Sequence, residues 1–241
     1  MPPHPIEQFN FADGQVILVD KPYTWSSYSV VNKIKRLVRT KVGHAGTLDP
    51  LATGLMVLCT GKFTSKLGNL IEEDKEYTGT IYLGATRPSC DRETAIDQEF
   101  DISHLTEEKV RQAAQQFEGE IEQVPPLYSA IKQEGEELYK KARRGEEVVI
   151  RSRKVRINVF EITEVEMPLI HFRINCSKGT YIRSLARDFG VALGTGSHLY
   201  DLRRTKSGQF SIEDAWNVQK LGEYLIENKA LILQHARIHK R

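Results

Sequence analysis

The sequence has few cysteines, the residues that support disulfide, thiol redox and thiolate zinc chemistry. Only three cysteines are present, Cys59, Cys90 and Cys176, and no two of them form a CxxC pair. Scattered thiols in odd number argue against both a disulfide framework and a thiolate zinc site. The stretch Gly194-Thr195-Gly196-Ser197 lacks the remaining positions of a phosphate-binding loop. We therefore expect a protein that works without a metal ion or other cofactor.

Targeting signals are also missing. No run approaches the roughly 18 apolar residues of a transmembrane helix, and Met1-Pro2-Pro3-His4-Pro5 lacks the charged and apolar parts of a secretory signal. These absences predict a cytoplasmic protein that does not act at a membrane. The 241 residues, 40% of them hydrophobic and 27% charged, are typical of a globular protein with a sizeable core.

The charges are nearly balanced overall but unevenly distributed. The formal net charge is +2, yet residues 91–122 hold ten acids against three bases, and residues 139–156 hold eight bases against two acids. A further basic group contains no acid and consists of Lys33, Lys35, Arg36, Arg39 and Lys41. Such segregation fits basic faces that follow a phosphate backbone, and it fits solvated helix faces equally well. Charge alone leaves both interpretations open.

The apolar periodicity indicates strands and helices that do not alternate strictly. The run 55–59 is typical of a buried strand, and alternation within 155–176 predicts a hairpin. Helical spacing follows a cap at Ser26 or Ser27 and begins again near Thr180. We therefore predict an α+β fold with a mixed, largely antiparallel sheet flanked by helices.

We expect one catalytic domain over residues 1–241, with no separate C-terminal domain, because too little chain follows Trp216 to form one. Within this domain the segment 124–151 is basic and contains the chain breakers Pro125-Pro126 and Gly145. This segment is predicted to be an inserted basic arm or lid over a ligand.

One loop has the features of a segment that presents a catalytic carboxylate. Its sequence is Gly43-His44-Ala45-Gly46-Thr47-Leu48-Asp49-Pro50-Leu51-Ala52-Thr53-Gly54. Its three glycines and one proline exclude a regular helix, and Pro50 biases Asp49 towards an extended backbone. The apolar run that follows anchors the loop to the core, so that one carboxylate is presented from a shaped turn. An Asp-Pro pair of this kind also caps turns in many proteins without any catalytic role.

The loop resembles the active-site motif of the bacterial tRNA pseudouridine synthases of the TruB class, and the match is long and ungapped. Further segments are similar to motifs of that family, occur in the family's order and span residues 15–216: Asp20-Lys21-Pro22, Lys75-Glu76-Tyr77, residues 125–132 with 138–143, residues 176–186, and Leu202-Arg203-Arg204-Thr205. The chain resembles a short form of the family that lacks the C-terminal RNA-binding module.

The resemblance implies the pseudouridine synthase fold and the isomerisation of one uridine, at position 55 in the T-arm loop of tRNA, to pseudouridine. In that reaction the bond from uracil N1 to the ribose breaks, and the base turns and rejoins through C5. By resemblance Asp49, Tyr77 and Arg183 form the catalytic set. An isolated carboxylate in a water-poor pocket tends to protonate, so Arg183 is expected to keep Asp49 ionised. Attack on the sugar, attack on the base and proton abstraction remain open as roles of Asp49.

The resemblance also implies six substrate-binding residues: His44, Lys21, Tyr181, Leu202, Lys132 and Arg143. The uridine must be flipped out of its loop at a cost of a few kcal/mol, and stacking on Tyr77 returns roughly 1–3 kcal/mol. His44 resembles the residue that fills the space left by the flipped base, and Leu202 would close an apolar wall. The expected partner is the tRNA T-stem-loop, bound by a monomer without guide RNA.

Two departures from the family pattern affect loops. Thr24 stands where the family has glycine, and Arg87-Pro88-Ser89-Cys90-Asp91 replaces a more acidic Thr-Asp-Thr pattern. The alternative function is a tRNA-binding or tRNA-folding protein in which catalysis is secondary. A synthase that acts on ribosomal RNA or with a guide RNA is a further alternative.

Overall fold

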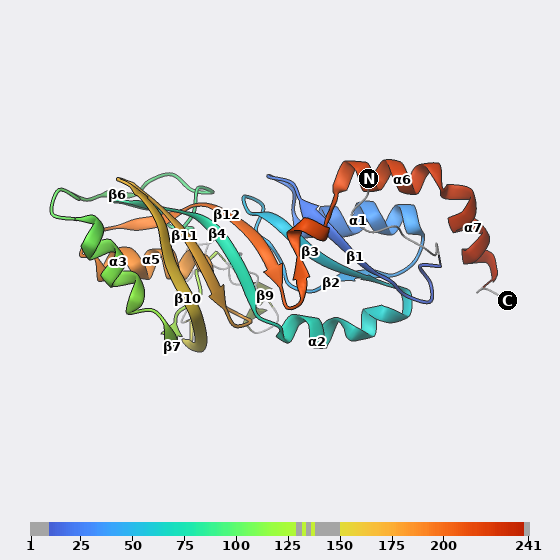
Figure 1. Cartoon of the computed structure of the whole chain (residues 1–241), viewed down its shortest axis with the longest axis horizontal. Coiled ribbons are helices and arrows are strands. Elements are labelled where there is room, and N and C mark those ends of the chain that lie inside the picture. The colour runs from blue at the N-terminus through green and yellow to red at the C-terminus, as the bar shows by residue number, and fades with distance from the viewer. Residues whose placement is uncertain (1–9, 129–131, 134–135, 138–149, 239–241) are drawn as a thin grey trace. The chain divides into compact units, whose positions relative to one another are not determined.

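The computed structural model describes residues 10–128, 132–133, 136–137 and 150–238. The chain forms two compact units (Figure 1). Unit 1 comprises residues 1–76 and 203–241, and unit 2 comprises residues 77–202. The boundaries fall within two strands, β4 (Lys75–Leu83) and β12 (Ser197–Ser207).

Unit 1 is built on β1 (Val16–Lys21) and β3 (Thr53–Thr60), which pair antiparallel over their whole common length. β2 (Val42–His44) adds to β3 antiparallel, whereas β14 (Trp216–Asn217) and the end of β12 pair with β1 and β3 in parallel. Every residue of β3 except Thr53 is buried. This central position explains why 55–59 is an unbroken apolar run.

The helical elements of unit 1 follow the predicted signals. Helix α1 (Ser27–Val38) begins after Ser26, whose hydroxyl accepts a hydrogen bond from the Ser29 N–H, and buries Val30, Ile34 and Val38. The remaining helical elements are η1 (Gly61–Lys66), α2 (Leu67–Glu72), the short η2 (Ile212–Asp214), α6 (Val218–Glu227) and α7 (Lys229–Ile238). Helix α6 packs against α1 and against β1 (Figure 1).

Unit 2 is a sheet covered by two helices, with β4 inserted between β11 (Leu169–Cys176) and β12. Its strand order is β12-β4-β11-β10-β7, with β7 (Gly119–Gln123), β10 (Arg153–Glu166) and β11 pairing antiparallel. Helices α3 (Glu107–Gln115) and α5 (Ile182–Ala192) pack together, and α3 also packs on β10. The rings of Phe117, Phe160 and Phe189 meet at centroid distances of 5.3–6.2 Å and form the core between these elements.

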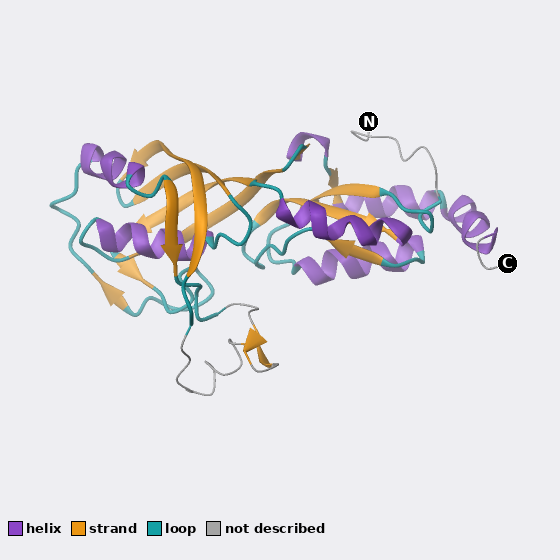
Figure 2. Cartoon of the chain, turned by 90° about the horizontal axis from the view of Figure 1, so that it is seen from below, coloured by secondary structure: helices purple, strands orange, loops and turns teal. Residues whose placement is uncertain are grey.

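The smaller strands complete the inventory: β5 (Ala85–Thr86) pairs with β6 (Gln98–Glu99), β8 (Lys132–Gln133) pairs with β9 (Glu136–Glu137), and β13 (Phe210–Ser211) pairs with the end of β12. Helices and strands occur in both units without a repeated strand–helix–strand order (Figure 2). The predicted α+β class with a mixed, largely antiparallel sheet is therefore confirmed. No helix of the described residues has the length and apolarity needed to cross a membrane.

Candidate active site

The loop that carries Asp49 connects β2 to β3 and is fastened to the first turn of α1. The buried Ser27 hydroxyl accepts a hydrogen bond from the Leu48 N–H at 2.8 Å and donates one to the Leu48 carbonyl at 2.9 Å. The Ala52 N–H closes the next turn on the Asp49 carbonyl at 3.1 Å. Asp49 itself is half-buried. Its backbone is thus fixed on both sides, and the residue is only partly covered by the rest of the protein.

Lys21 holds the other side of this loop. Its side chain is fully buried, and its ammonium group donates to the carbonyls of Pro22, Trp25 and Pro50. Burial lowers the pKa of Lys21 to about 8, and the charge of Asp49 opposes that shift. Lys21 therefore ties the Asp49 loop to the turn before α1 and places a positive charge in the electrostatic field of the carboxylate.

Arg204 supports the same loop from β12. It is only 1% exposed, and it donates to the Leu55 carbonyl at 2.7 Å and to the Gly46 carbonyl at 3.2 Å. Gly54 has φ +105°, and a Cβ there would lie 2.3 Å from the Arg204 carbonyl, so glycine is required. Burial lowers the pKa of His44, and the charge of Arg204 lowers it further. His44 is therefore neutral at neutral pH, which suits a side chain expected to pack beside a nucleobase.

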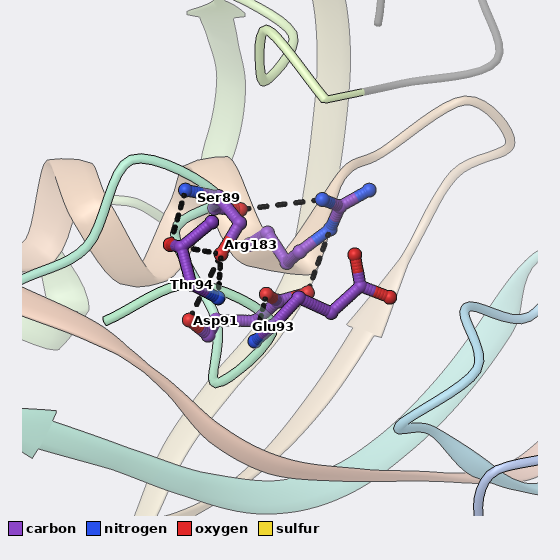
Figure 3. Close-up of polar contacts among 5 residues, drawn as sticks. All are labelled: Ser89, Asp91, Glu93, Thr94 and Arg183. Carbon is purple, nitrogen blue, oxygen red and sulfur yellow. Dashed lines mark hydrogen bonds and ion pairs between the residues drawn. The ribbon is translucent and has the colours of Figure 1, made fainter. Parts of the chain in front are cut away.

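Unit 2 contains a buried ion pair between Arg183 of α5 and Asp91. The Arg183 side chain is 5% exposed, and its Nε lies 3.6 Å from Oδ2 of Asp91, which is 6% exposed (Figure 3). Its Nη1 also donates to the Ser89 carbonyl at 3.2 Å. Asp91 was missed as a site residue from the sequence, because the segment 87–91 departs from the family pattern. The one sequence feature that points to Asp91 is its position as the first acidic residue after β4.

The turn around Asp91 is closely hydrogen-bonded. Oδ1 of Asp91 accepts from the Glu93 N–H at 3.0 Å, and the Ser89 hydroxyl donates to the Asp91 carbonyl at 3.0 Å (Figure 3). The Ser89 and Thr94 hydroxyls pair at 2.8 Å, and Cys90 adopts φ +59° at the apex. This network fixes the carboxylate of Asp91 in the direction of the Arg183 guanidinium.

Tyr181 immediately precedes α5 and is held by a residue that the sequence did not single out. The side-chain amide of Gln123 accepts from the Tyr181 N–H at 2.8 Å and donates to the Tyr181 carbonyl at 3.1 Å. Gln123 is fully buried, and the Arg153 guanidinium lies 4.8 Å from the centre of the Tyr181 ring. The end of β7 therefore positions the start of α5 and, two residues further, Arg183.

The structure places the other predicted residues as follows. Tyr77 lies in β4 with 9% exposure, and Leu202 lies half-buried in β12. Lys132 belongs to β8, and Arg143 lies outside the described residues. Lys21, His44 and Asp49 thus belong to unit 1, whereas Tyr77, Lys132, Tyr181, Arg183 and Leu202 belong to unit 2. Among the described residues no group of three or more His, Cys, Asp or Glu side chains could hold a metal ion.

Comparisons with known proteins decide the family. Residues 34–182 match the model of the TruB family pseudouridylate synthase N-terminal domain, and residues 183–235 match that of the tRNA pseudouridylate synthase B C-terminal domain. The chain belongs to the TruB family of pseudouridylate synthases. The resemblance drawn from its motifs is thereby confirmed.

Individual TruB relatives match over most of their length. The tRNA pseudouridine synthase B of Flavobacterium johnsoniae is 53% identical over 89% of this chain and 97% of that protein. That of Clostridium tetani is 46% identical over 88% of this chain and 74% of that protein.

Among solved structures, one chain of a Cbf5-Nop10-Gar1 complex is 33% identical with a TM-score of 0.72. The match covers 95% of this TruB-family chain and 60% of that one. A chain of an H/ACA RNP bound to a substrate RNA containing 2'-deoxyuridine is 31% identical, with a TM-score of 0.70 over 95% of this chain and 59% of that one.

Proposed function

We propose that this protein isomerises a uridine in the T-arm loop of tRNA, at position 55, to pseudouridine. The observation that carries the proposal is the Asp49 loop, which occurs within a family match spanning residues 34–235. Relatives that bear the name tRNA pseudouridine synthase B support tRNA as the substrate. We further propose that the protein acts in the cytoplasm as a monomer and without guide RNA.

The chemistry is assigned to Asp49. An ionised carboxylate can attack the ribose, attack the uracil or abstract a proton, and each of these roles requires a negative charge next to the flipped nucleotide. The charge of Lys21 favours that ionised form, because the two groups attract each other. The fastening of Leu48 to Ser27 limits the movement of the carboxylate during the reaction.

Arg183 and Tyr77 are proposed to act on the same uridine. Arg183 is charged at every relevant pH and would keep the carboxylate of Asp49 ionised. Its pairing with Asp91 orients the guanidinium. Tyr77 would stack on the flipped base, which repays part of the cost of extrusion. The neutral His44 would fill the space left in the RNA loop, and Leu202, Tyr181, Lys132 and Arg143 would line or position the substrate.

Pseudouridine mapping tests the proposed function. In cells that lack this gene, position 55 of tRNA should remain uridine, the wild-type gene should restore pseudouridine there, and Asp49→Asn should not. A tRNA-folding protein with secondary catalysis would instead keep its main effect in the Asp49→Asn strain. Loss of pseudouridine in ribosomal RNA, with tRNA unchanged, would contradict the assigned substrate.

A further inference from the structure

A groove of about 830 Å³ lies between α1 and α6 in unit 1. Asp49 is not among the residues that line it. The wall on the α1 side carries Trp25, which precedes the helix, and Tyr28, Asn32, Lys33 and Arg36. Tyr28, Asn32 and Arg36 repeat every four residues along α1 and Lys33 follows Asn32, which places these four on one side of the helix. Aromatic rings therefore occupy the start of this face and cations occupy its end.

The aromatic part of the groove is open. Tyr28 is 74% exposed, although a tyrosine normally buries much of its ring when it serves the core. Trp25 is half-buried and lies under the Lys33 ammonium group at 5.5 Å from its ring centre. The groove therefore combines one exposed ring, Tyr28, with a cation–aromatic pair at Trp25, and proteins stack unpaired bases on aromatic rings in positively charged grooves.

The cations of the groove are available to an anion. The described ion pairs of unit 1 join Lys62 to Asp13, Arg203 to Asp20 and Lys206 to Glu76, and thus involve neither Lys33 nor Arg36. Gly222 of α6 leaves room for the Lys33 chain, since a Cβ there would lie 3.0 Å from its Cε. Among the described residues that line the groove, Glu223 is the only one with a carboxylate.

The groove adjoins the Asp49 loop through the main chain. The Trp25 carbonyl accepts a hydrogen bond from Lys21, and Lys21 also bonds to Pro50. Ser27, at the start of α1, bonds to both polar groups of the Leu48 backbone. An RNA that reaches Asp49 therefore passes close to the turn at which the groove begins.

We propose that the α1–α6 groove binds an unpaired nucleotide segment of the tRNA substrate, beside the T-arm contact. One base stacks on Tyr28, and its neighbouring phosphates contact Lys33 and Arg36. The volume accommodates a nucleotide, and the free positive charges complement the phosphates. This inference rests on the proposed function for the identity of the RNA, but binding in the groove is measured independently of catalysis.

The test measures binding of an unmodified full-length tRNA transcript to the purified protein over a series of salt concentrations. The double variant Lys33→Gln/Arg36→Gln should bind more weakly, and its slope of log affinity against log salt should fall by about 1.4, for two phosphate contacts to a single strand. The control Lys35→Gln/Lys41→Gln removes two exposed charges that do not line the groove and should keep the wild-type slope.

Single changes separate stacking from charge. Tyr28→Ala should lose about tenfold in affinity, within the range for one base on one aromatic ring, whereas Tyr28→Phe should bind like wild type. Glu223→Gln should bind more tightly, because it removes a carboxylate from the described lining of the groove. Equal weakening of the two double variants, or unchanged binding of the Lys33→Gln/Arg36→Gln protein, would overturn the inference, and the latter would favour a protein partner.

The two proposals fail in different ways. If wild-type protein makes no pseudouridine but the groove variants lose tRNA binding, the proposed function fails and the groove assignment stands. If wild-type protein makes pseudouridine and the groove variants bind tRNA normally, only the groove assignment fails.

Discussion

The two units bury their cations by different means. In unit 2, Arg183 faces the carboxylate of Asp91, so that its charge is compensated by a full negative charge. In unit 1, Lys21 and Arg204 are held by the carbonyl dipoles of five residues, namely Pro22, Trp25 and Pro50 for Lys21 and Leu55 and Gly46 for Arg204. Dipoles satisfy hydrogen bonds but leave the net charge in place. Unit 1 therefore holds its buried cations with main-chain dipoles, with the charge of Asp49 acting on Lys21, whereas unit 2 places a carboxylate against Arg183.

The largest expected effect comes from breaking the buried pair. Asp91→Ala removes the carboxylate that faces the buried Arg183 charge, so we expect it to lower the free energy of unfolding by about 3–5 kcal/mol. Urea unfolding measures this. Arg173 and Glu161 form an exposed pair at 2.7 Å, and Glu161→Gln should cost less than about 1 kcal/mol.

A double variant sharpens the same comparison. Asp91→Leu/Arg183→Met removes both charges and should recover most of the lost stability, because a buried ion pair contributes little net stability relative to apolar side chains. It should not recover pseudouridine formation. Recovery of both would show that the pair serves the fold alone.

The dipole-held cation predicts a pH effect. Lys21, with a pKa of about 8 in the folded protein against 10.5 ordinarily, loses its charge as the pH rises through about 8. We expect pseudouridine formation under single-turnover conditions to decline through that range as the field on Asp49 weakens.

Raising the pH has the opposite effect on stability: the contribution of Lys21 to the free energy of unfolding increases where its contribution to activity declines. Between about pH 8 and 10.5 the unfolded chain binds the Lys21 proton more strongly, so unfolding takes up a proton and this group's contribution to stability rises with pH.

Lys21→Arg should move the decline in pseudouridine formation to higher pH. A decline at the same pH in this variant would assign it to another group.

The smallest effect concerns the turn that supplies two of the carbonyls around Lys21. Thr24 has φ +68°, a conformation that costs a β-branched residue energy and that glycine adopts freely. Thr24 stands where the family has glycine, and the turn keeps the positive φ that glycine adopts freely. Thr24→Gly should raise the unfolding free energy by about 1 kcal/mol, measured by urea unfolding. Thr163→Gly, in the exposed face of β10, should lower it.

The features that could be predicted from the sequence are those that depend on residues close together in the chain. A cap at Ser26 or Ser27, the periodic face of α1 and the apolar strand behind Asp49 are each determined by neighbours within a few residues, and all three are present, with Ser26 as the cap. Asp91 and Gln123 were not predicted, because their partners Arg183 and Tyr181 lie far along the chain. A main-chain contact such as that of Gln123 leaves no pattern in a single sequence.

The most direct test of the role of Asp49 is a single-turnover measurement at saturating tRNA. We expect Asp49→Asn to bind the tRNA within about twofold of wild type and to lose pseudouridine formation by on the order of 10⁴-fold or more, the upper end of what one positioned acid or base contributes. Asp101→Asn, which changes a surface carboxylate in unit 2, should behave like wild type in both respects. A rate for Asp49→Asn close to that of wild type would contradict the assignment of the chemistry to Asp49.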